Sequence, residues 1–238
     1  MTTLFISDLH LDDRRPETTA LLQKFLLNEA FNADALYILG DLFEYWLGDD
    51  VPSQSSIAVA DALSRISGSG VACYFMHGNR DFLLQDAYAK QAGVTLLPEE
   101  HVIDLYGEQV LLMHGDSLCT DDTAYQQLRT LVRSPAWQQD TLSKTPQERL
   151  QMALQLRDAS DEHKGNEDIS IMDVNHDAVI RAFERHDVLR MIHGHTHRPA
   201  THDLVVNGQS AQRIVLGDWY TQGSVLRVGP GSYELSWL

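Results

Sequence analysis

Residues 192–199 read IHGHTHRP, in which His193, His195 and His197 stand at alternate positions around Gly194. The apolar run that precedes them, residues 189–192, predicts a buried strand that ends in this polar cluster. Alternate residues of an extended segment project to the same side, with Cα atoms about 6.5 Å apart. We therefore expect His195 and His197 to direct two ligands into one small volume, and His193 to end the buried strand.

Four further polar clusters follow short apolar runs that predict buried strands. These runs cover residues 4–6, 35–39, 71–76 and 110–113. The clusters are DLH with Asp8 and His10, GD with Asp41, GNRD with Asn79 and Arg80, and HGD with His114 and Asp116. Because sites in α/β sheets form at the carboxyl ends of strands, we expect all five clusters to share one rim.

The segments between the strands predict an α/β fold. Helical patterns cover residues 16–30, 56–67, 82–91 and 171–185, and a strand-helix-strand order is typical of a mainly parallel sheet. After Pro199, the turn signals VVNGQ (205–209) and VGPGSY (228–233) separate alternating strands and predict a second, partly antiparallel sheet.

Residues 120–168 differ from the rest of the chain. They are helical in pattern, are interrupted by Pro135 and Pro146, and lie between two predicted strands. Because long insertions between core elements are commonly functional, we interpret this segment as a helical cap. The core is then expected to comprise residues 1–119 and 169–238.

Composition and charge restrict the class of protein. The 238 residues include 18 Lys and Arg against 34 Asp and Glu, a formal net charge of −16, which argues against a nucleic-acid partner. Cys73 and Cys119 form no CxxC pair, so we expect two reduced thiols. No basic n-region opens the chain, and no run reaches the roughly 18 apolar residues of a membrane span, so we expect a cytoplasmic protein.

The residue types in the five clusters suit a two-metal centre. Hydrolytic sites of this kind hold two ions about 3.5–4 Å apart. A carboxylate such as Asp41 can bridge both ions, while neutral imidazoles and an amide oxygen complete each shell. Mixed oxygen and nitrogen ligands suit Mn²⁺, Fe or Zn²⁺ better than Ca²⁺ or Mg²⁺. Each motif alone also fits a strand-end cap or a turn, but five in order favour a site.

The ordered set D-x-H, G-D, G-N, H-G and G-H-x-H resembles the calcineurin-like metallophosphoesterases. This resemblance implies two packed mixed β-sheets flanked by helices and a dinuclear metal site. Carried over to this chain, one metal would bind Asp8, His10, Asp41 and His197, and the other Asp41, Asn79, His114 and His195, with Asp41 bridging. His195 and His197 would then serve different ions.

One position departs from that pattern. Many members have a histidine after the asparagine, placed to protonate an alkoxide leaving group, whereas this chain has Arg80, which does not give up its proton. A phosphate leaving group, whose second pKa is about 6, is already a stable anion. We therefore expect the scissile bond to be a pyrophosphate, and Arg80 to hold phosphate oxygens and offset charge in the transition state.

Longer stretches, among them LFISDLHL, ALYILGDLFEYWLGDD, CYFMHGNRDFLL and MIHGHTHRP, resemble the UDP-2,3-diacylglucosamine hydrolases of lipid A biosynthesis. The resemblance covers nearly the whole chain. It implies that water attacks the α-phosphoryl group, usually with Mn²⁺, and releases UMP and 2,3-diacylglucosamine 1-phosphate (lipid X). The substrate would be a lipid-linked UDP-sugar, with any peripheral contact to the cytoplasmic face of the inner membrane made through the cap. No nucleic acid and no obligate protein partner are expected.

The family's substrate contacts correspond to Asn79, Arg80, Asp122, Tyr125, Arg157, Ser160 and His195. Structural alternatives stay open in the cap, because Asp122 suits a helix cap, Tyr125 the core and Arg157 a solvated face. The family's asparagine, and the lysine three residues further on, are Lys164 and Glu167 here. An acid repels a phosphate, so we expect Lys164 or Arg157 to take over the phosphate pairing.

Two other functions stay open from the sequence. The same metals could act on another nucleotide diphosphate or on a phosphodiester, or the fold could be a non-catalytic metal-binding scaffold, which the full ligand set disfavours. Trp46 and Phe82, next to the predicted metal-binding segments, are expected in the core, with a wall of the acyl-chain pocket as the alternative. The histidines interpreted as structural or surface residues are His77, His101, His163, His176, His186 and His202.

Overall fold

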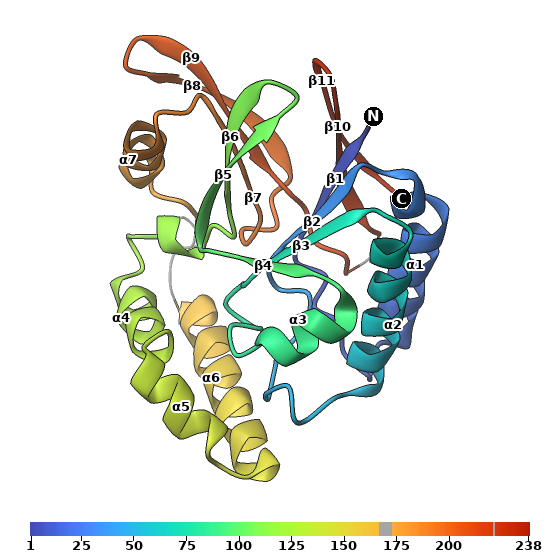
Figure 1. Ribbon diagram of the computed structural model, residues 1–238. Helices are drawn as coiled ribbons and strands as arrows, with labels where there is room; N and C mark the ends of the chain where they lie inside the picture. Colours follow the sequence, from blue (N-terminus) through green and yellow to red (C-terminus); the bar gives the residue numbers. More distant parts are fainter. Residues whose placement is uncertain (167–172, 221) are drawn as a thin grey trace.

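The computed structural model describes residues 1–166, 173–220 and 222–238, and the side chains of residues 158–166 are outside this description. Two β-sheets pack against each other, with helices on both outer sides (Figure 1). This is the architecture that the sequence predicted. Among the described residues, no helix has both the length and the apolarity that a membrane span requires.

The first sheet is mainly parallel, as predicted. Its strands, in spatial order, are β11 (Ser232–Trp237), β10 (Ser224–Gly229), β1 (Thr3–Ile6), β2 (Ala35–Leu39), β3 (Ala72–Met76) and β4 (Thr95–Leu97). Strands β1 to β4 run parallel, with Phe5 beside Tyr37 and Tyr37 beside Tyr74, while β10 and β11 are antiparallel. The carboxyl ends of β1, β2 and β3 therefore lie at one edge.

The second sheet is mixed. Its order is β5 (Glu100–Leu105), β6 (Glu108–Met113), β7 (Arg190–His193), β9 (Gln209–Val215) and β8 (Ala200–Val206). Strands β6, β7 and β9 are parallel neighbours, and the two outer pairs are antiparallel. The turn predicted between β8 and β9 has positive φ at both Asn207 and Gly208, as a type I′ hairpin requires.

The two-sheet arrangement changes the predicted rim. The runs at 110–113 and 189–192 form β6 and β7 of the second sheet, so the five polar clusters follow strands of two sheets. Strands β4 and β5 were not predicted from the sequence, and β5 is the strand at which the chain passes from the first sheet to the second. It pairs with β6 through a tight turn in which Tyr106 and Gly107 both have positive φ, and no crossover helix returns the chain to the first sheet.

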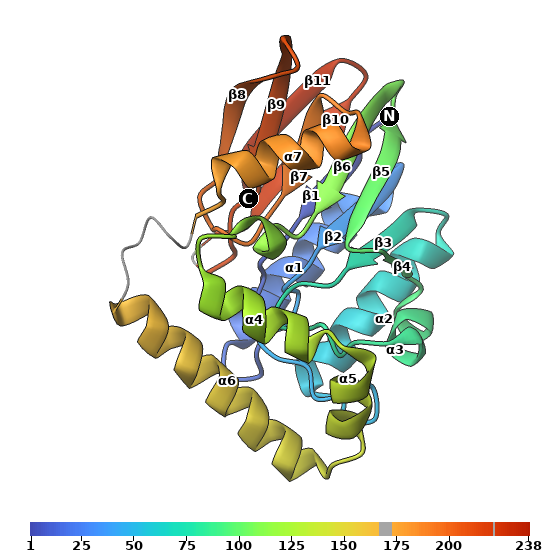
Figure 2. The same ribbon diagram turned by 90° about the vertical axis from the view of Figure 1, so that its left-hand side faces the viewer.

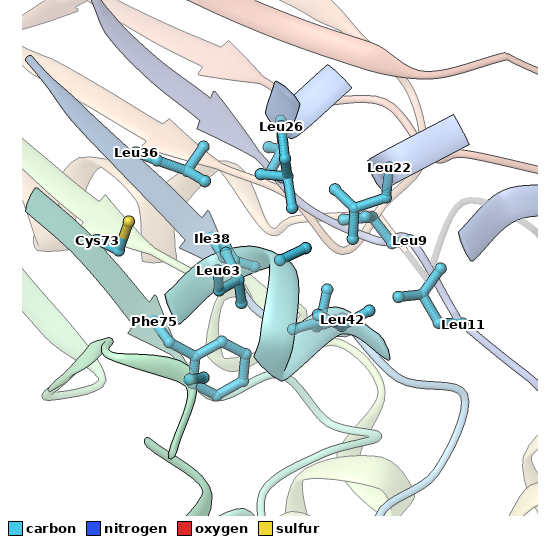
Figure 3. Close-up of a cluster of buried hydrophobic side chains, with 14 of the residues drawn as sticks. Leu9, Leu11, Leu22, Leu26, Leu36, Ile38, Leu42, Leu63, Cys73 and Phe75 are labelled. Atoms are coloured by element: carbon cyan, nitrogen blue, oxygen red, sulfur yellow. The ribbon is translucent and has the colours of Figure 1, made fainter. Parts of the chain in front are cut away.

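Three apolar clusters hold these layers together. Helices α1 (Pro16–Asn28), α2 (Gln54–Gly68) and α3 (Asp86–Ala92) cover the outer face of the first sheet. Leu22, Ile38, Leu63 and Phe75 belong to the buried cluster on this face (Figure 3). A second cluster lies between the sheets. The third packs helix α7 (His176–His186) on the outer face of the second sheet (Figure 2).

Two helices begin later than predicted. Helix α3 starts at Asp86 and not at residue 82, because Leu84 donates its N–H to the Asp81 carbonyl in a turn before it. Helix α7 starts at His176, where the Asn175 side chain accepts the Ala178 N–H as an N-cap. The predicted starting residue 171 lies outside the described residues. Short 3₁₀ helices occupy Ala30–Asn32 (η1) and Asp116–Leu118 (η2).

Three helices lie between β6 and α7 in the chain. They are α4 (Thr123–Val132), α5 (Pro135–Leu142) and α6 (Pro146–Asn166). Helices α5 and α6 each begin with a proline, at the two positions where the sequence predicted an interruption of the helical pattern. They stand apart from both sheets, beyond the strand ends (Figures 1 and 2). The boundary expected at residues 168–169 falls outside the described residues.

Candidate metal centre and adjoining cavity

The polar clusters meet at one end of the two-sheet sandwich. Asp8 and His10 follow β1, Asp41 follows β2 and Asn79 follows β3, whereas His114 follows β6 and His195 and His197 follow β7. The two sheets therefore contribute opposite walls of one site.

The backbone at this site differs from the extended segments we expected. Five of the seven predicted ligands have positive φ, between 50° and 69°: Asp8, His10, Asp41, His195 and His197. In the described chain only Tyr106, Asp187 and Asn207 share this conformation among non-glycine residues. Such backbone costs on the order of 1 kcal/mol or more per residue and clusters at functional sites. Left-handed turns, and not strand alternation, make the side chains converge.

Two glycines permit the close approach of these loops. A Cβ on Gly78 would collide with the Asp41 side chain and backbone, and a Cβ on Gly194 would collide with Asp8 and Ser7. These positions bring loops of different strands within contact distance. Each glycine therefore contributes the space that a predicted ligand occupies.

One group of donors surrounds His10. The Nε2 atoms of His10 and His197 lie 3.2 Å apart, and His197 Nε2 is 3.4 Å from Asp8 Oδ1. These three side chains offer ligand atoms that lie within 4.8 Å of one another, as a shared ion would require. They are three of the four residues predicted for one half-site, the set of ligands to one ion, and that assignment stays a prediction.

A second group surrounds Asn79. Its Oδ1 atom is 3.0 Å from His114 Nε2 and 2.9 Å from His195 Nδ1. Asp41 Oδ2 lies between the groups, at 3.8 Å from His10 Nε2 and 3.7 Å from His114 Nε2. This placement suits a carboxylate that bridges two ions.

The charge state of the site suits cations. Asp8 Oδ1 is buried and has no hydrogen-bond partner among the described residues. Burial disfavours the charged form of Asp8, but the close contact and charge of His197, together with the charges of His114 and His10, hold the pKa of Asp8 below its usual range. Burial, with the nearby His114, lowers the pKa of His195 to about 4, which leaves its imidazole neutral. A buried carboxylate oxygen that accepts no hydrogen bond, beside imidazole nitrogens that can act as ligands, fits a divalent metal ion.

Two carboxylates beside the donors, Asp81 and Asp116, were given no role from the sequence, although Asp116 belongs to the predicted HGD cluster. Asp81 accepts the N–H groups of Leu42 (2.7 Å) and Gly78 (2.8 Å), and so ties the loop of Asp41 to the loop of Asn79. Asp116 accepts from Tyr125 Oη at 2.9 Å and from Arg129 Nε at 2.8 Å. Asp81 belongs to the GNRD motif and Asp116 to the HGD motif, so their places next to predicted ligands could have identified them.

Glu44 was also missed. It is 7% exposed, and its Oε2 atom lies 3.3 Å from His10 Nδ1. Burial alone would raise the pKa of Glu44, but the contact and charge of His10, with the charges of Arg80 and Arg157, lower it. Glu44 is therefore an ionised, buried carboxylate directly behind a predicted ligand.

An apolar cavity adjoins the donors. It lies between the first sheet's loops and helices α4 to α6. Asn79 and Arg80 lie in its wall, and its apolar lining includes Trp46, Phe82, Leu83, Leu128, Val132, Trp137, Met152 and Leu156. Trp46 and Phe82 belong to the core cluster or pack against it, as expected, and they also line this cavity.

The predicted contacts in the cap fall into three cases. Asp122 accepts the Tyr125 N–H at 2.9 Å and so caps α4, which is the helix-capping role that the sequence left open as an alternative. Tyr125 and Arg157 both line the cavity, with Arg157 Nη1 3.7 Å from Glu44 Oε1. The side chains of Ser160 and Lys164, and the whole of Glu167, lie outside the described part of the structure.

His193 is separate from the donors. It ends β7 fully buried, its Nδ1 lies 2.9 Å from the Gly194 carbonyl, and its Nε2 accepts from Arg213 Nη1 at 3.0 Å. Burial and the charge of Arg213 lower the pKa of His193 to about 3. His77 Nε2 similarly contacts the Leu84 carbonyl at 2.7 Å. Both rings have structural partners.

Comparison with known proteins places the chain in a family. The family model described as calcineurin-like phosphoesterase matches residues 1–199. A UDP-2,3-diacylglucosamine hydrolase of Stenotrophomonas maltophilia (strain K279a) is 54% identical over 100% of this chain and 99% of its own length. One of Escherichia coli O157:H7 (strain EC4115 / EHEC) is 52% identical over 99% and 98%.

A solved structure described as a novel archaeal phosphodiesterase aligns over the whole of both chains with a TM-score of 0.48 and 12% identity. The chain belongs to the calcineurin-like phosphoesterases and, within them, to the family of the UDP-2,3-diacylglucosamine hydrolases. It is a metal-binding hydrolase of the phosphoesterase class.

Proposed function

We propose that this protein hydrolyses the pyrophosphate bond of UDP-2,3-diacylglucosamine in an Mn²⁺-dependent reaction, as a step of lipid A biosynthesis. The observation that carries the proposal is the apolar cavity that opens beside Asn79 and Arg80. A substrate with an anionic head group and apolar chains suits a site in which Arg80 and the proposed metal ligands stand next to an apolar cavity. The names of relatives at 52–54% identity support the same substrate.

The proposed ligands divide into two sets that share Asp41. Asp8, His10 and His197 would hold one ion, and Asn79, His114 and His195 the other. Two divalent ions bound there would activate water and draw charge from the phosphoryl oxygens. Asp41 would keep the two sets at a fixed separation, because its carboxylate contacts both.

The chain's own residues would perform the remaining tasks. Water adds its oxygen to the α-phosphorus, the bond from that phosphorus to the bridging oxygen breaks, and the released protons pass to solvent. The leaving group is the sugar 1-phosphate, which needs no proton from a side chain at neutral pH. Arg80, half-buried in the cavity wall, would pair with phosphate oxygens and offset the charge that develops.

The cap would bind the lipid portion. Tyr125 and Arg157 reach the cavity from α4 and α6, and Trp137 from α5 contacts Phe82 at 6.0 Å between ring centroids. We propose residues 120–168 as the unit that covers the acyl chains. Contact with the cytoplasmic face of the inner membrane would then be made through these helices, where Leu131 and Leu154 are exposed.

An oxygen-labelling experiment tests the proposal. The purified protein with Mn²⁺ should convert UDP-2,3-diacylglucosamine in H₂¹⁸O into UMP that carries the label and into unlabelled lipid X, as mass spectrometry would show. Asp41→Ala should reduce turnover at least about 10³-fold, because it removes the shared ligand. UDP-sugars without acyl chains should react slowly. Release of inorganic phosphate, or label in the sugar phosphate, would contradict the assignment.

A further inference from the structure

Glu44 has contacts that the proposed mechanism does not use. Its Oε2 atom lies 3.3 Å from His10 Nδ1 and 3.6 Å from Arg15 Nη2, while Oε1 lies 3.7 Å from Arg157 Nη1. The side chain is only 8% exposed. One buried carboxylate therefore meets a proposed metal ligand, the loop after β1 and a helix of the cap.

The orientation of the His10 ring makes the first contact important. Its Nε2 atom faces His197 and Asp41, so Nε2 must carry the lone pair if it binds an ion. The proton must then sit on Nδ1, which faces Glu44. At 3.3 Å the contact is longer than an ideal N–H···O bond, and Nδ1 makes no hydrogen bond to any residue of the described chain. Glu44 is thus the group placed to select this tautomer.

The other imidazoles at the site have different support. His114 Nδ1 contacts the Leu39 carbonyl at 2.8 Å, which is a backbone group that no substitution removes. His197 Nδ1 lies 3.6 Å from Asp218 Oδ2, and the Asp218 side chain is 27% exposed. Water can replace a partly exposed carboxylate more readily than a buried one. His10 therefore depends most on a single buried side chain.

We propose that Glu44 is a positioning residue, which holds His10 with Nε2 towards the metal centre and holds Arg157 of α6 beside the same half-site. The inference rests on the metal assignment proposed above and not on the identity of the substrate. It assigns Glu44 no contact with the reacting atoms. Loss of its charge should weaken one ion and leave the other in place.

Metal titration of Glu44→Gln tests the proposal. Calorimetry, with electron paramagnetic resonance to count bound Mn²⁺, should show one of the two ions bound about 10–100-fold more weakly and the other within threefold of the parent protein. The matched control is Glu99→Gln, which also removes a carboxylate that contacts two arginines, Arg129 and Arg133, but lies away from His10. It should bind both ions normally.

A double-mutant cycle separates positioning from a general effect of charge or folding. In a His10→Gln background, Glu44→Gln should change ion binding by less than threefold, because the ring that it positions is gone. Full additivity, equal weakening by Glu99→Gln, or unchanged binding in Glu44→Gln would each overturn the proposal. If Glu44→Gln does not fold, the cycle is run with Glu44→Asp. Because ion binding is measured without substrate, these outcomes are independent of whether the proposed hydrolysis is correct.

Discussion

Single residues at this site differ in role although they look alike in sequence. His193, His195 and His197 alternate in one short stretch, yet their surroundings are distinct. His195 contacts Asn79, His197 contacts His10 and Asp8, and His193 contacts Arg213 on the far side of Gly194. The role of each histidine therefore depends on the loop conformation that directs its ring, and not on the residue type alone.

Substitution of these histidines should separate the roles. His197→Gln should weaken one bound Mn²⁺ at least about tenfold, because it removes a proposed ligand. His193→Gln should retain both ions, since it lies outside the donor groups, and should instead lower the free energy of unfolding by about 1–3 kcal/mol through its buried bond to Arg213. Ion counting and urea unfolding measure the two effects. Loss of an ion in His193→Gln would contradict this separation.

At the scale of elements, the helices of the cap region attach to the core at particular side chains. Arg129 of α4 donates to Asp116, and Arg133, the residue that follows α4, donates from Nη2 to the Gly78 carbonyl at 2.8 Å. These bonds join α4 to the loops that carry His114 and Asn79. Helix α4 is thus fixed to the walls of the proposed metal centre.

Helix α6 attaches through Arg149. This side chain is 6% exposed and donates to both carboxylate oxygens of Asp50, at 2.6 and 3.0 Å, and to the carbonyls of Leu47, Leu142 and Lys144. It joins the start of α6 both to the core and to the end of α5. Arg149 is buried although the Asp50 side chain is 61% exposed, and the bidentate geometry distinguishes this ion pair from an ordinary surface pair.

Arg149→Met should loosen these two helices selectively. We expect amide hydrogen exchange in residues 135–157 to become at least about tenfold faster, since several acceptors lose their donor. Exchange in β1 to β3 should stay unchanged. Lys144→Met is the control, because its ion pair with Asp140 is exposed and of the kind worth only about 0.3–0.5 kcal/mol. Equal acceleration in both variants would argue against Arg149 as the attachment.

For the whole molecule, the loops after β1 and β2 bring two buried carboxylates together at the end of the two-sheet sandwich. Asp8 and Asp41 are both nearly fully buried, and the chain carries a formal charge of −16. Oxygens of these two carboxylates lie within 4.8 Å of each other in one donor group. Bound cations would relieve this repulsion and tie the ends of the two sheets together.

Metal should therefore stabilise the fold measurably. At an Mn²⁺ concentration 100 times its dissociation constant, one ion adds about 2.7 kcal/mol, and this should raise the Tm of a chain of this size by about 5–10 °C. Chelation with EDTA should reverse the shift. Asp41→Asn should be at least as stable as the metal-free parent, because a buried charge is removed, but should show no such shift. A full shift in Asp41→Asn would refute Asp41 as the shared ligand.

Much of the fold and of the candidate site could be predicted from local sequence. Short apolar runs marked β1, β2, β3, β6 and β7, because a strand buried on both faces has few polar residues. The structure brings together all seven residues proposed as ligands, and their assignment to ions stays a prediction. The polar residue types, the position of Arg80 and the helical pattern of residues 120–168 also came from the sequence alone.

Only the tertiary structure decided how these parts meet. The sequence could not divide the strands between two sheets, because β6 joins the second sheet by pairing with β7, a strand much further along the chain. It could not show that left-handed backbone aims Asp8, His10 and Asp41, since φ depends on contacts such as those at Gly78 and Gly194. Nor could it place Glu44 behind His10 or join Arg157 to it across 113 residues. Residue chemistry is local, whereas burial and contact between distant loops exist only in the folded chain.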